Sequence, residues 1–291
     1  MRSRPLSSTA IAVNRPALIG PVVVSIPHAG RLYPPEILAA ARVAQADLQR
    51  LEDSWCDLIA AGAVGAGATV IQGIWARAVA DCNRGEGQMA PGEVAVSLRA
   101  QFSAPGRKER AGLGVVPTRL ADCGPLWKKP IDQAALQWRL ELFHRPYHAA
   151  LADALAAALD RFGYAVLIDL HSMPPVPVSQ PGHGTRVVVG DHFGVTAGEW
   201  LVEQIITSVQ RLPQSVSRNV PYAGGHIVRA HGRPAQGVHA VQIEIDRSLY
   251  LTSDRRPDAA GVARMAHWFA ALLNALAQAR PGAAAMPQAA E

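Results

Sequence analysis

The sequence contains little cysteine, few aromatic residues and no long hydrophobic run. Its 3 cysteines show no Cys-x-x-Cys spacing, which argues against a disulfide framework or a structural zinc knuckle and fits a reducing compartment. Aromatic residues make up 5% of the chain and the arginines are scattered, so we expect no nucleic-acid partner. No segment reaches about 18 uninterrupted apolar residues, and the N-terminus lacks the apolar core of a signal peptide. We therefore expect a cytoplasmic protein with no membrane association.

Lysine is also scarce. Lys108, Lys128 and Lys129 are the only lysines among 28 basic residues, which face 23 acidic ones and give a net charge of +5. The positive charge is thus almost entirely arginine, whose planar guanidinium can grip a carboxylate or phosphate with two hydrogen bonds. What is present is a globular composition, 49% apolar and 18% charged, over 291 residues. This length supports a sizeable core.

Short runs rich in Val and Ile alternate with longer segments of helical period. This alternation predicts a single α/β domain whose mixed, mostly parallel central sheet is flanked by helices. The predicted strands are 22–26, 69–74, 165–170, 186–189 and 240–245. The predicted helices are 35–63 with a break, 137–162 with a kink or restart at Pro146, 196–212 with a capping Thr196, and 259–277.

Three segments depart from this alternation. Residues 84–130 contain many Gly and Pro and little periodicity, so we interpret them as a long functional loop or a small subdomain. Residues 1–17 and 281–291 are expected to be disordered, which leaves 18–280 as the folded domain.

Two of the predicted strands end in histidine. His28 follows VVVSI, and His171 follows AVLIDL, with Asp169 two residues earlier. Ligands bind open α/β sheets at the carboxyl ends of strands, so these imidazoles are candidates for one site. With one carboxylate they would make an open three-ligand zinc site. Glu52 or Asp53, in the predicted helix that contains LEDSW, could supply it, although an exposed acidic pair is the alternative.

A further carboxylate interrupts the apolar strand VQIEI. An unpaired carboxylate inside such a strand is costly, so Glu244 is either in an ion pair or a general base beside a metal site, and we favour the base. Asp246 has the same strand parity and is the alternative. The segment WARAVADCNRGEG places Arg77, Asn83 and Arg84 close together, a set suited to a carboxylate-bearing substrate or to a salt bridge with Asp81.

Two other patches could contribute to substrate binding. The first, HRPYHAAL, contains Arg145 and could equally be a helix restart. The second, YAGGHIVRAHG, has the paired glycines of an active-site loop, with Gly225, His226 and Arg229 as candidates for binding the oxygen atoms of a ligand.

Read in order, SIPHAG, EDSW, DCNR, RPYHAAL, DLHSMP and YAGGHIVRAHGRPAQGVHAVQIEI form a set that resembles the N-formylglutamate amidohydrolase family. The resemblance runs from about residue 20 to about residue 255. It implies an α/β fold like that of the zinc carboxypeptidases and aspartoacylase, one zinc ion and a small-molecule N-acyl amino acid substrate. The implied reaction cleaves N-formyl-L-glutamate to formate and L-glutamate in histidine degradation.

The resemblance also implies roles for individual residues. His28, Asp53 and His171 would hold zinc, and Glu244 would activate the attacking water and protonate the leaving amine. Arg77 would polarise the scissile carbonyl, while Asn83 and Arg84 would hold the substrate carboxylate. Two alternatives stay open: a deacylase or carboxypeptidase of the same superfamily that acts on another N-acyl amino acid or a short peptide, and a non-catalytic carboxylate-binding protein.

Overall fold

A computed structural model describes residues 9–102, 104–212 and 214–279 of the chain. Seven strands form a mixed sheet in the order β1-β3-β2-β6-β9-β7-β8. Their bounds are β1 Ile11–Asn14, β2 Val22–Ile26, β3 Thr69–Gly73, β6 Ala165–Met173, β7 Val187–Gly190, β8 Val216–Arg218 and β9 Val238–Asp246. The strands β3, β2, β6 and β9 run parallel, whereas β1 and β7 pair antiparallel with β3 and β9. The predicted α/β class is confirmed.

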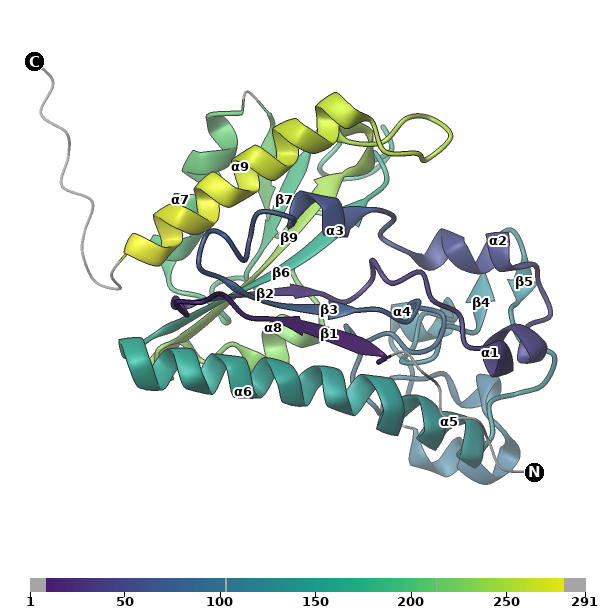
Figure 1. Ribbon diagram of the computed structural model, residues 1–291. Helices are drawn as coiled ribbons and strands as arrows, with labels where there is room; N and C mark the ends of the chain where they lie inside the picture. The colour runs from purple at the N-terminus through teal and green to yellow at the C-terminus, as the bar shows by residue number, and fades with distance from the viewer. Residues whose placement is uncertain (1–8, 103, 213, 280–291) are drawn as a thin grey trace, which may run out of the picture.

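Helices cover both faces of the sheet, as Figure 1 shows. One face packs against α3 (Cys56–Ile59), α7 (Glu199–Gln210) and α9 (Ala259–Gln278) through the odd-numbered apolar residues of β9. The other face packs against α6 (Arg145–Phe162) and α8 (His226–His231). Because side chains alternate along a strand, Gln242 and Glu244 point to the α6 and α8 side.

Shorter elements gather at one end of the sheet (Figure 1). They are α1 Pro35–Ala40, α2 Gln45–Leu48, α4 Arg107–Arg110, β4 Arg119–Leu120 and β5 Gly124–Pro125, with 3-10 turns at Gln49–Leu51, Pro91–Glu93 and Val96–Gln101. Two further 3-10 turns, Pro234–Gln236 and Arg247–Leu249, flank β9. The stretch 84–130 is therefore a loop region with little regular structure. Apolar residues such as Leu98 and Leu126 nevertheless anchor it in the core.

The structure corrects four details of the sequence interpretation. Residues 11–14 form an edge strand that pairs with β3, so the expected disorder does not hold there; residues 1–8 and 280–291 lie outside the described residues. The segment 35–63 is three short helices rather than one broken helix. The Thr196 hydroxyl donates to the carbonyl of Ala240 instead of capping a helix, and α7 begins at Glu199.

The fourth correction concerns the helix restart that was one of two alternatives at Pro146; the other, a kink, stays a prediction. α5 (Gln133–Arg139) continues through a wide turn of π-helix, Leu140–His144, directly into α6, and Pro146 lies in the first turn of α6. The wide turn accommodates the missing N–H of proline without a restart of the chain. No helix of the described residues is long and apolar enough to cross a membrane.

Candidate metal centre and active site

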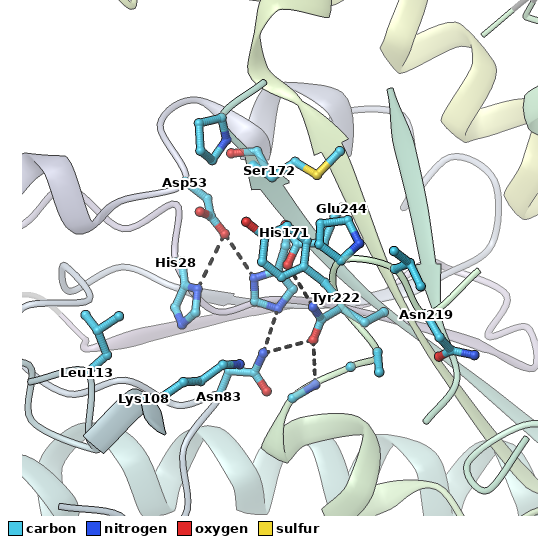
Figure 2. Close-up of a pocket in the computed structure, with 18 of the residues that line it drawn as sticks. His28, Asp53, Asn83, Lys108, Leu113, His171, Ser172, Asn219, Tyr222 and Glu244 are labelled. Atoms are coloured by element: carbon cyan, nitrogen blue, oxygen red, sulfur yellow. Dashed lines mark hydrogen bonds and ion pairs between the residues drawn. The ribbon is translucent and has the colours of Figure 1, made fainter. Parts of the chain in front are cut away.

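Two histidines meet at the carboxyl ends of β2 and β6. His28 follows β2 by two residues and His171 lies within β6, and their ring centroids are 4.8 Å apart. Both rings turn Nδ1 towards the same oxygen of Asp53, at 2.9 Å from His171 and 3.4 Å from His28 (Figure 2). All three side chains are buried, and one ligand atom from each lies within 4.8 Å of the others. The structure thus brings together the predicted ligand set.

The loop before α3 decides between the two adjacent acids. The sequence analysis placed Glu52 and Asp53 in a helix, and this prediction is wrong. Both residues follow a 3-10 turn and lie in an irregular loop. The Asp53 amide donates to the carbonyl of His28 at 3.0 Å, which ties this loop to the end of β2. The Glu52 carboxylate turns away and accepts a hydrogen bond from the Tyr33 hydroxyl, and burial raises the pKa of Glu52 to about 7. Only Asp53 of this pair faces the histidines.

A second pair of carboxylates lies behind the histidines. His28 Nε2 is 2.7 Å from Asp81, and His171 Nε2 is 2.8 Å from Asp169. Both aspartates are fully buried. An aspartate at Nε2 holds the proton on that nitrogen, so the lone pair of Nδ1 is available to a cation. This histidine–carboxylate arrangement is a recurrent feature of protein metal sites.

Unsatisfied polar atoms support the same assignment. Nδ1 of His28 is buried and has no hydrogen-bond partner among the described residues, although a buried polar atom without a partner is costly. Asp169 and Asp53 outweigh the effect of burial and raise the pKa of His171 well above its usual value. The surrounding carboxylates thus favour positive charge at this point of the structure. Two imidazole nitrogens and one carboxylate oxygen fit a zinc ion with open positions.

Glu244 lies beside this cluster. It pairs in register with His171 across the neighbouring strands β6 and β9, and Gln242 donates to its Oε1 at 2.7 Å. Burial raises the pKa of Glu244 to about 7, against the opposing charge of His171. Asp246, the alternative base, forms an ion pair with Arg186 at 3.1 Å and does not line the cavity. A carboxylate that titrates near neutral pH is suited to accept and return a proton.

These residues line one cavity of about 900 Å³. Of the residues predicted for the site, the lining includes His28, Asp53, Arg77, Asn83, Arg84, His171, Gly225 and Glu244. Further polar lining comes from residues that the sequence interpretation did not select: Arg107, Lys108, Asn219, Tyr222, Gln242 and Arg247. Gln242 could have been predicted from the sequence, because it shares the strand face of Glu244 and also interrupts an apolar run. Lys108 could not have been predicted, since the segment that contains it has no periodicity.

The carboxylate-binding candidates differ in how they are held. Arg77 forms an ion pair with Asp81 at 2.7 Å, and Asp81 raises the pKa of Arg77 against the effect of burial. The Asn83 amide donates to Gln242 at 3.1 Å, and its oxygen accepts from the backbone N–H of Ile227 at 2.9 Å, so this side chain fixes the start of α8. Among the described residues, Arg84 donates to two backbone carbonyls, those of Leu113 at 3.0 Å and Asn83 at 2.6 Å, and to no side chain.

Three residues predicted to bind substrate lie elsewhere. Arg145 is on the surface, where it forms an ion pair with Glu86 at 2.7 Å. His226 and Arg229 belong to α8 and are not part of the cavity lining. The His226 ring packs against the ring of His148 on α6, with centroids 5.2 Å apart. Of the glycine-rich loop, the cavity receives the backbone up to Gly225, because the chain turns into α8 directly after it.

A model of one family, described as N-formylglutamate amidohydrolase, matches residues 20–251. The chain belongs to this family. Its curated relatives include two N-formylglutamate deformylases. The one from Pseudomonas putida is 32% identical over 145 residues, and the one from Pseudomonas aeruginosa is 32% identical over 147 residues. Each alignment covers 48% of this chain and 54% of the relative, so the match spans about half the length of these relatives.

Solved structures agree with this membership. The crystal structure of N-formylglutamate amidohydrolase from Ralstonia eutropha is 28% identical with a TM-score of 0.83, and the match covers 93% of this chain and 98% of that one. A gene product from Agrobacterium tumefaciens, 19% identical with a TM-score of 0.62 over 92% of this chain and 94% of that one, shares the fold. The family resemblance that the motifs suggested is therefore confirmed.

Proposed function

We propose that this protein is a zinc-dependent amidohydrolase that cleaves N-formyl-L-glutamate to formate and L-glutamate, the step that the resemblance places in histidine degradation. The observation that carries the proposal is the convergence of His28, Asp53 and His171 on one point, with Glu244 beside them in a cavity rich in arginine. The names of its relatives supply the substrate: two N-formylglutamate deformylases and an N-formylglutamate amidohydrolase.

His28, Asp53 and His171 would hold the zinc ion. When bound, zinc would supply a water of lowered pKa and a positive charge beside the scissile carbonyl. The chain itself prepares this site, because Asp81 and Asp169 orient the two imidazoles through their Nε2 atoms.

Glu244 accepts a proton from the attacking water and returns it to the leaving amine. Its position beside His171 and its pKa of about 7 suit both transfers at neutral pH. Arg77, held in the charged state by Asp81, stabilises the negative charge that develops on the carbonyl oxygen. Arg84 binds a substrate carboxylate. Asn83 supports it, because its backbone carbonyl accepts from Arg84 and its side chain fixes the start of α8.

The proposal is tested by measuring hydrolysis of N-formyl-L-glutamate, N-acetyl-L-aspartate and a dipeptide by the zinc-loaded protein, with formate and free amine as readouts. We expect N-formyl-L-glutamate to be cleaved with the highest kcat/KM. Preferred cleavage of either other compound would overturn the choice of substrate. Absence of all three activities together with absence of zinc binding would indicate a non-catalytic carboxylate-binding protein.

A further inference from the structure

The cavity holds two kinds of basic side chain. Arg77 and Arg247 each form an ion pair with a buried aspartate, Asp81 at 2.7 Å and Asp53 at 3.1 Å respectively. The other basic lining residues are Arg84, Arg107 and Lys108. Within 9–102, 104–212 and 214–279, no carboxylate lies within ion-pair distance of these three. The α4 side of the cavity therefore carries three cations that have no direct ion-pair partner among the described residues.

Lys108 is placed to meet a ligand. Figure 2 shows its side chain extending from α4 towards Asn83, and it lines the same cavity as His28. Lys108 stays exposed to solvent. Partial burial and the positive charge of Arg84 lower the pKa of Lys108, and the more weakly acting Asp81 opposes this shift. Such convergence is costly until an anion binds, so it favours a ligand with more than one negative charge.

The loop around α4 fixes this position. The backbone N–H of Leu113 donates to the carbonyl of Lys108 at 2.9 Å, and the carbonyl of Leu113 accepts from Arg84 at 3.0 Å. Gln88 donates to Glu109, the next residue of α4, at 3.0 Å. Lys108 and Arg84 are thus tied to the same short stretch of backbone, which holds two unpaired cations on one wall of the cavity.

We propose that Lys108 is a specificity-determining residue that binds the side-chain carboxylate of an acidic N-acyl amino acid, with Arg107 as a secondary contact and Arg84 left for the other carboxylate. This inference rests on the proposed function and extends it. A substrate with one carboxylate would match Arg84 alone. N-formylglutamate has two, separated by a short aliphatic spacer, and would pair with both Arg84 and Lys108.

The test compares N-formyl-L-glutamate with N-formyl-L-glutamine, which has nearly the same shape but a neutral side-chain amide. For the zinc-loaded Lys108→Met variant we expect kcat/KM on the glutamate compound to fall by about 10- to 100-fold, the loss of one charge-assisted contact. On the glutamine compound it should change by less than about 3-fold. Lys108→Arg should recover most of the selectivity for glutamate, because the charge is restored.

Arg110→Met is the matched control. Arg110 lies on the same helix, is exposed, donates to the carbonyl of Pro105 and does not line the cavity. Its substitution removes the same charge and should leave both kcat/KM values within about 2-fold of wild type. An equal loss on both substrates in Lys108→Met, or no loss on either, would overturn the inference.

The proposed function can fail separately. If the wild-type protein cleaves neither compound, calorimetric titration of wild type and Lys108→Met with the two compounds still tests Lys108. Selective weakening of N-formyl-L-glutamate binding in the variant would support the assignment. Equal affinity of both compounds for the wild-type protein would refute it.

Discussion

Two groups of buried or partly buried histidines lie close together in this protein and differ in their hydrogen-bond acceptors. His171 contacts aspartate carboxylates through both ring nitrogens. His28 contacts Asp81 through Nε2, and its Nδ1 faces Asp53 at 3.4 Å without a hydrogen bond. The second group, between α6 and α8, consists of His144, His148, His226 and His231, and we call it the interhelical histidines. Two of these contact backbone carbonyls, those of Arg84 and Cys82, and His148 contacts His231 at 2.9 Å.

The difference shows that burial alone does not decide the charge of an imidazole. Beside Asp169 and Asp53, the pKa of His171 is raised despite burial. Among the interhelical histidines, burial and the neighbouring rings lower the pKa of His148 to about 3, and burial lowers the pKa of His226 and of His231 to about 4. Carboxylates prepare the first group for a positive charge, whereas the second group serves as neutral packing.

The largest effect on activity should come from Glu244, the carboxylate beside His28 and His171 that we assign as general base. Glu244→Gln keeps the shape of the side chain but cannot accept the proton, so we expect kcat to fall by about 10²- to 10⁴-fold. Zinc content should stay unchanged. Glu203→Gln, the same change on the exposed face of α7, is the control and should retain full activity. Full turnover by Glu244→Gln would remove the general-base role.

The carboxylates behind the histidines give the next effect. Asp169→Asn and Asp81→Asn each weaken the hold on one imidazole, and we expect each to raise the Kd for zinc by about 10- to 100-fold. Asp191→Asn is the control, since Asp191 is a fully buried aspartate that pairs with Arg218, contacts none of the proposed zinc ligands and, among the described residues, meets the cavity lining only through Asn219. If zinc affinity fell only in Asp191→Asn, and not in Asp169→Asn or Asp81→Asn, the role of Asp81 and Asp169 in orienting the imidazoles would be contradicted.

The interhelical histidines should make stability depend on acidity. Their folded pKa values lie below that of an unfolded histidine, so the unfolded chain binds more protons below about pH 6.5 and stability falls as the pH falls from there towards the folded values. For His148, whose folded pKa is about 3, we expect a loss of about 1–2 kcal/mol between pH 7 and pH 5.

Urea unfolding of the metal-free protein measures this dependence. His148→Gln removes the titrating group and should flatten the curve of unfolding free energy against pH by that amount. Parallel curves for the variant and the wild type would show that His148 is not held neutral in the fold.

The smallest effect concerns Arg145, which follows His144 directly but faces the surface. Its ion pair with Glu86 is about half exposed, at 45% and 41%. We therefore expect Arg145→Ala to change the free energy of unfolding by less than about 0.5 kcal/mol. Its kcat/KM should stay within 2-fold of the wild-type value. A tenfold loss of activity would restore Arg145 to substrate binding.

Sequence patterns predicted the first histidine group but not the second. His28, His171 and Glu244 were predictable because parallel strands place their carboxyl ends at one edge and strand parity fixes which side chains share a face. His226 and Arg229 were assigned to substrate binding because they follow a glycine-rich loop. Where α8 begins, and which side of it meets α6, depends on tertiary packing that the local sequence does not encode.

The same limit applies to the fold. The five buried strands were predicted by their runs of Val and Ile, whereas the edge strands β1 and β8 are short and only partly buried, so that they resemble loops. Asp53 was placed in a helix, since the 3-10 turn before it has no distinct pattern. Lys108 was missed because the loop region 84–130 is organised by contacts with distant residues.

Zinc titration of the metal-free protein, followed by elemental analysis after dialysis, tests the central claim most directly. We expect wild type and His148→Ala to retain about one equivalent of zinc, and His171→Ala to retain less than about a tenth. Less than about half an equivalent in wild type, or loss of zinc from His148→Ala instead of His171→Ala, would contradict the account.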